Sequence, residues 1–80
     1  MPNNDHWHTI TDSSIISGAG VQKGRLVVVF HKDGHTTGVY AYTTDDIKIG
    51  EGLCCRMVMS DSKGTFLHQH IRPLPYAKIG

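Results

Sequence analysis

The stretch RLVVVFHKDGHTTGVYAYTT, residues 25–44, constrains the fold of this 80-residue chain more than any other part of it. Its first seven residues, Arg25 to His31, are dense in β-branched side chains and are bounded by Gly24 and by Asp33-Gly34, a pattern that is typical of a strand. The run that follows also favours β-structure, and HKDGH between the two runs is a hairpin turn signal. The sequence therefore predicts a central β-hairpin.

The hairpin turn decides which way two tyrosines of the second strand point. Tyr40 and Tyr42 lie two residues apart and must share one side of the sheet. A two-residue type I′ turn at Asp33-Gly34 would place Val27 opposite Tyr40 and Arg25 opposite Tyr42. The rings would then lie away from Leu26, Val28 and Phe30, as an open platform on which nucleic-acid bases could stack.

A three-residue loop over Lys32-Asp33-Gly34 gives the other arrangement. It shifts the pairing by one residue, so that Leu26 opposes Tyr40 and both rings join Leu26, Val28 and Phe30. We favour this loop because it requires a positive φ only at Gly34, the residue that tolerates it best. Under this interpretation the tyrosines belong mostly to the core, and their hydroxyls reach its rim.

The remaining segments complete an α+β pattern. The segment TITDSSIISGAGV, residues 9–21, predicts a further strand. Residues 45–59 predict a helix that is capped by Thr44 or Asp45 and carries an apolar stripe. A second helix begins after Ser60 or Ser62 and ends before Pro73, and the tail YAKI adds a short edge strand or covers the core. We predict a three-stranded antiparallel β-meander followed by two α-helices packed on one face of the sheet. Residues 1–8 are expected to be a flexible N-terminal segment and residues 9–80 a single domain. The two stripes consist of Leu53, Cys54, Met57 and Val58, and of Phe66, Leu67, His70 and Ile71.

Composition narrows the class of protein. Hydrophobic residues make up 39% and charged residues 19% of the chain, and the formal net charge is +1, so a folded domain without a strongly basic character is expected. The adjacent Cys54 and Cys55 are poorly placed for a disulfide. No signal peptide or run long enough to cross a bilayer is evident. These features predict a cytoplasmic protein with reduced thiols and no membrane association.

Several motifs, taken in their order along the chain, resemble the KTSC domain. This small domain is found alone in bacterial and phage proteins and at the C-terminus of some lysyl-tRNA synthetases. They are SSIISGAG, RLVVVF, Tyr40-Ala41-Tyr42, DSKGTFLHQHI and LPYAKI, which span Ser13 to Ile79. The resemblance implies this fold and suggests RNA binding, with the family's tyrosine pair on Tyr40 and Tyr42. The chain departs from the family pattern at Ala41, where a charged residue is frequent, at His68, where asparagine is usual, and in a longer segment before Ser62.

Catalytic and metal chemistry find little support in the sequence. His68 and His70 lie two apart on a predicted helix and diverge too far to chelate one ion, and no carboxylate or thiol completes a zinc set. The sequence shows no glycine-rich phosphate-binding loop, no carboxylate pair for acid–base catalysis and no nucleophile with an identifiable general base. We therefore expect no catalytic residue, no metal and no cofactor, and a protein that is not an enzyme.

Two binding functions remain. The first is RNA or nucleotide binding through a basic patch at the second helix together with the tyrosine pair. The second is a protein–protein module, a bacterial or phage regulator or inhibitor that docks on a larger host protein by strand addition or through an apolar patch. The candidate site residues for the first are Lys63, His68, Arg72, Lys78, Tyr40 and Tyr42.

Overall fold

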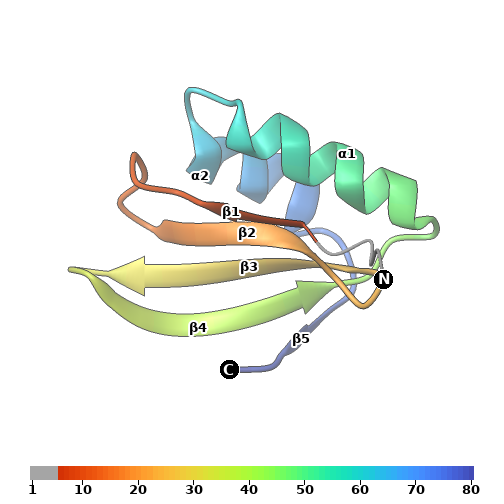
Figure 1. The fold of residues 1–80 in the computed structure, drawn as a ribbon, viewed down its shortest axis with the longest axis horizontal. Coiled ribbons are helices and arrows are strands. Elements are labelled where there is room, and N and C mark those ends of the chain that lie inside the picture. The colour runs from red at the N-terminus through yellow and green to blue at the C-terminus, as the bar shows by residue number, and fades with distance from the viewer. Residues whose placement is uncertain (1–5) are drawn as a thin grey trace.

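The computed structural model describes residues 6–80 and orders them as a five-stranded sheet with its helices on one side (Figure 1). The strands follow one another across the sheet in the order β1-β2-β3-β4-β5, and every neighbouring pair is antiparallel. The elements are β1 (His6–Thr9), β2 (Ile16–Gln22), β3 (Arg25–Lys32), β4 (His35–Tyr42), α1 (Ile47–Val58), α2 (Lys63–Phe66), the π-helical η1 (Leu67–Ile71) and β5 (Tyr76–Lys78).

The α+β class, the antiparallel sheet and the two helical segments are confirmed, whereas the predicted three-stranded meander is wrong. The segment expected to be one strand is split, because Ser13 forms a turn in which its Oγ accepts hydrogen bonds from the backbone N–H groups of Ile15 and Ile16. The tail supplies the fifth strand beside β4. Residues 6–8, assigned by the sequence to a loose segment, lie in β1, and residues 1–5 of that segment lie outside the described residues.

The central hairpin has a two-residue turn, so the predicted three-residue loop is wrong. Asp33 and Gly34 both have positive φ, 53° and 82°, and Lys32 pairs with His35, as in a type I′ turn. Between this turn and the rest of the ladder the register shifts, because Thr37 is an extra residue in β4: His31 pairs with Thr36, but Phe30 pairs with Gly38.

This bulge restores the face that the sequence predicted for the tyrosines. Beyond it, Val28 pairs with Tyr40 and Leu26 pairs with Tyr42. Both rings therefore lie on the helix-facing side of the sheet with Leu26, Val28 and Phe30, although the pairing expected between Leu26 and Tyr40 is displaced by two residues. Tyr42 is 4% exposed, and Tyr40 is half-buried beside the core.

The core lies between this face and the helices. Asp46 caps α1 by accepting a hydrogen bond from the Lys48 N–H at 2.9 Å, one residue beyond the two predicted caps. Helix α1 packs on β2 and β3 and buries Cys54 and Met57, as its stripe predicted. The buried cluster comprises Ile10, Ile16, Ala19, Val21, Leu26, Val28, Tyr42, Cys54, Met57, Leu67 and Ile71.

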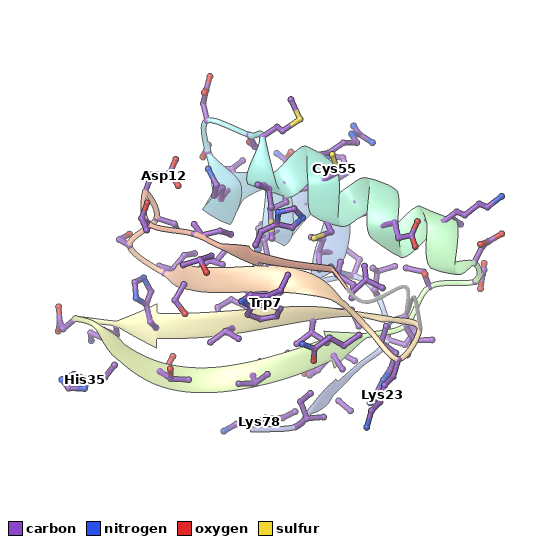
Figure 2. The ribbon with its side chains drawn as sticks, viewed as in Figure 1. Trp7, Asp12, Lys23, His35, Cys55 and Lys78 are labelled. Atoms are coloured by element: carbon purple, nitrogen blue, oxygen red, sulfur yellow. The ribbon has the colours of Figure 1, made fainter. Side chains whose placement is uncertain are left out.

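Within residues 6–80, the opposite face of the sheet carries no helix (Figure 1). Trp7 of β1 lies against β2 on this face (Figure 2), where a Cβ added to Gly18 would lie 2.5 Å from the indole. The missing side chain at Gly18 thus makes room for the ring, which is 44% exposed. Close approach of this kind is one reason for a glycine within a strand.

Candidate functional site

A groove of about 560 Å³ lies between the second helical segment and the β4–β5 side of the sheet. It exists because α1 packs on β2 and β3, so that the helix-facing side of the two following strands is only partly covered. The groove is lined by Ile15, Phe30, Thr37, Gly38, Tyr40, Tyr42, Gly64, Leu67, His68, Arg72 and Tyr76.

Four aromatic rings from three strands form the floor and one border of the groove. Tyr40 is central: its ring lies 5.4 Å from Phe30 in an edge-to-face arrangement, 6.5 Å from Tyr42 in a stacked one and 5.6 Å from Tyr76. These spacings between ring centroids are those of favourable aromatic pairs. Tyr76, at the edge strand, is 61% exposed. The cluster therefore presents an open ring surface that is supported from beneath by packed rings.

The helical wall of the groove brings cationic or titratable groups to these rings. Segment η1 is π-helical, and the Arg72 N–H donates to the Leu67 carbonyl oxygen at 2.9 Å, five residues back. The wider turn of a π-helix places residues four and five apart on one side, so Leu67, His68 and Arg72 all line the groove. Burial raises the pKa of the Tyr42 phenol, and the nearby positive charge of Arg72 acts in the opposite direction. The guanidinium is therefore close enough to act on Tyr42.

Lysine 78 borders the same groove from the sheet edge. It pairs with Tyr40 across β4 and β5, and its Cε lies 3.7 Å from the position that a Cβ on Gly38 would take. The side chain is exposed and lies at the outer strand (Figure 2). Its ammonium can thus approach an anion held in the groove from the side opposite Arg72.

The structure brings together five of the six site residues predicted from the sequence. Tyr40, Tyr42, His68 and Arg72 line the groove, and Lys78 borders it. The sixth, Lys63, is not among the residues that line the groove and is only 8% exposed. Its Nζ donates to Asp12 Oδ2 at 3.0 Å and to the Ser60 carbonyl oxygen at 3.0 Å. The sequence could not indicate this pairing, because the two side chains are 51 residues apart.

The ion pair between Lys63 and Asp12 joins the β1–β2 loop, where Figure 2 labels Asp12, to the start of α2. The hydrogen bond from Lys63 lowers the pKa of Asp12 below its ordinary value of 3.8. A lowered folded-state pKa means that the pair stabilises the fold above pH 3.8 and that this contribution is lost as the pH falls through the folded pKa.

We therefore expect Asp12→Asn to lower Tm at about pH 7 and to have a smaller effect at about pH 2.5, because the stabilisation by the charged carboxylate is lost as the pH falls through its lowered pKa. Thermal unfolding followed by circular dichroism at both pH values measures this difference. Asp61→Asn removes the same charge from an exposed acidic residue close to Lys63 in the sequence and serves as the control. A Tm loss of equal size for both variants at neutral pH would contradict the assignment.

Reasoning from the sequence did not assign three residues of the groove, Phe30, Thr37 and Tyr76, to the candidate site. Tyr76 and Lys78 alternate within YAKI as the residues on one face of a strand do, a signal that would have placed Tyr76 beside the tyrosine pair. Phe30 was assigned to the core alone, yet it also lines the groove. Thr37 reaches the groove only because of the bulge, and the isolated Gly38 beside it is the kind of strand glycine that marks one.

The other reactive side chains do not converge on the groove. Burial, with a smaller effect of Cys55, raises the pKa of the Cys54 thiol to about 11, so this cysteine is a packing residue. Cys55 lies on the exposed side of α1 (Figure 2). Within residues 6–80 no group of three or more His, Cys, Asp or Glu side chains could hold a metal ion.

Comparisons with family models, with curated proteins and with solved structures find no match to this chain. In the part of the chain that the structure describes, no helix combines the length and the apolar character needed to cross a membrane. The groove is therefore interpreted from its own residues.

Proposed function

We propose that this protein is a non-catalytic binding module of the KTSC type that binds single-stranded RNA in the groove between η1 and the β4–β5 edge. The observation that carries the proposal is the meeting of Arg72 and His68 with the Tyr40, Tyr42 and Tyr76 rings in one groove. Proteins that bind single strands combine cations that follow the phosphates with aromatic rings on which bases stack. The motifs that resemble the KTSC domain point to the same ligand class.

The geometry supports distinct roles for the residues of the groove. The exposed ring of Tyr76, backed by Tyr40, offers a surface for one base. Arg72 on the helical wall and Lys78 at the strand edge are placed to contact phosphates on either side of it. With a formal net charge of only +1, the whole domain attracts RNA weakly at long range, so affinity depends on these few local contacts.

The proposal is tested by measuring RNA binding at two salt concentrations. Arg72→Gln is expected to weaken binding of a fluorescein-labelled rU8 oligonucleotide about tenfold at about 50 mM salt. It should also reduce the slope of log K against log salt by about 0.7, which corresponds to one phosphate contact to single-stranded RNA. Fluorescence anisotropy at about 50 and 200 mM salt gives both values.

A matched control is available on the neighbouring helix. Arg56 carries the same charge but lies over the Phe66 ring at 5.4 Å, outside the residues that line the groove. Arg56→Gln should leave both affinity and salt slope within twofold of wild type. Equal losses for the two variants would mean that only the overall charge matters, and absence of RNA binding at low salt would exclude the proposed function.

The second candidate function, docking on a larger host protein, is favoured by a different observation. The helix-free face of the sheet exposes Trp7, and Ile79 next to the edge strand is 51% exposed. Among the described residues no strand pairs with the outer edge of β1 or β5, and exposed apolar side chains beside such an edge suit strand addition by a partner. Salt-insensitive or absent RNA binding, together with a stable protein partner lost in Trp7→Ala, would favour this function.

A further inference from the structure

The groove has two chemically different ends. At one end, the charge of Arg72 acts on Tyr42, which pairs with Tyr76. At the other end, Thr37 and Gly38 follow Thr36 on β4, whose partner His31 donates to the Ile15 carbonyl oxygen, and Gly64 lies against Ile15. Along β4 the two ends are separated by the rise from Gly38 to Tyr42, about 13 Å at roughly 3.3 Å per residue. One end therefore carries the guanidinium and two aromatic rings, whereas the other is lined by two glycines and a threonine hydroxyl, with Lys78 at its border.

Two glycines keep the second end open. A Cβ on Gly38 would lie 2.9 Å from Cε1 of Tyr40, and a Cβ on Gly64 would lie 2.9 Å from Cδ1 of Ile15. Larger residues at these positions would displace the Tyr40 ring from the floor or fill the space beside Ile15. The hollow thus depends on one glycine from the sheet and one from the helical wall.

The β-bulge places a hydrogen-bonding group at this end. Thr37 and Gly38 are consecutive, and in a regular strand consecutive residues face opposite sides of the sheet, yet both residues line the groove. The register shift between Phe30 and His31 makes this possible, since bulges redirect side chains at functional sites. Thr37 is exposed, and its hydroxyl can both donate and accept a hydrogen bond.

We propose that Thr37 is a specificity-determining residue, whose hydroxyl reads the edge of one base that enters the hollow between Gly38 and Gly64. This inference rests on the proposed RNA function. Phosphate contacts position a nucleic acid without distinguishing its sequence, whereas hydrogen bonds to base edges distinguish it. Arg72 and Lys78 then supply affinity, and Thr37 supplies base preference.

The test compares binding of rA8, rC8, rG8 and rU8 to wild type, Thr37→Val and Thr37→Ser. Wild type is expected to bind one of the four oligonucleotides about fivefold more tightly than the weakest, as one neutral hydrogen bond allows. Thr37→Val, which keeps the β-branched shape but removes the hydroxyl, should reduce the preference to within about twofold. Thr37→Ser keeps the hydroxyl and should retain it.

The outcomes separate this inference from the function on which it rests. Equal binding of all four oligonucleotides by wild type, or an unchanged preference in Thr37→Val, overturns the role of Thr37 while the effect of Arg72→Gln still supports the RNA function. No binding of any oligonucleotide to wild type at low salt overturns both. Circular dichroism confirms that each variant is folded, so that a lost preference reports the hydroxyl and not the fold.

Discussion

Ile71→Ala is expected to lower the free energy of unfolding by about 3 kcal/mol and Tm by at least about 12 °C. Ile71 is 0% exposed, in the last turn of η1, and belongs to the buried cluster formed by the sheet and α1. Truncation removes buried methyl groups and leaves a cavity beneath the helical segment. A domain of this size has little stability to spare, so the loss is expected to be a large part of the total.

The chain supplies a matched control in a second isoleucine close in sequence. Ile79 is 51% exposed, and Ile79→Ala should change the free energy of unfolding by less than about 0.5 kcal/mol. Urea unfolding followed by circular dichroism measures both variants. If Ile71→Ala does not fold, Ile71→Val should still cost about 1 kcal/mol. Similar effects at the two positions would mean that η1 is not docked on the core, and the wall that carries Arg72 would then not be held in place.

Local patterns were sufficient to predict the hairpin strands and the helical stripes, and they selected most of the residues that meet at the groove. Val28, Cys54, Met57 and Leu67 are buried, because alternation and helical spacing follow directly from backbone geometry. The basic end of the second helix lies near the tyrosine pair because both belong to the helix-facing side of the sheet. This proximity follows once the tyrosines are assigned to the correct face of the sheet.

The features that the sequence did not reveal depend on contacts between distant segments or on one extra residue. The face of Tyr40 was predicted correctly from an incorrect turn, because the type I′ turn and the bulge at Thr37 together shift the register by an even number of residues from the expected pairing. The position of Lys63 depends on Asp12, which approaches it only once the β1–β2 loop folds over α2. Neither effect is visible in a local window of residues.

Tyr76→Leu is expected to weaken binding of single-stranded RNA about tenfold, within the range measured for loss of one base–aromatic stack. Leucine keeps apolar volume beside Tyr40 and Tyr42, whose ring centroids lie 5.6 and 5.8 Å from that of Tyr76, but it offers no π-face. Tyr76→Phe keeps the ring and should bind within about twofold of wild type. Anisotropy titrations with rU8 at low salt measure these differences, and circular dichroism verifies the fold.

An exposed aromatic residue on the other side of the sheet makes this prediction specific to the groove. Trp7→Leu removes a ring with 44% exposure from the helix-free face and should leave RNA affinity unchanged. Tm is expected to fall, because the variant loses the packing of the indole on Gly18. A binding loss in Trp7→Leu without one in Tyr76→Leu would move the nucleic-acid surface to the helix-free face. Because the pairing register places the two rings on opposite faces of one sheet, comparing the two variants determines which face stacks the bases.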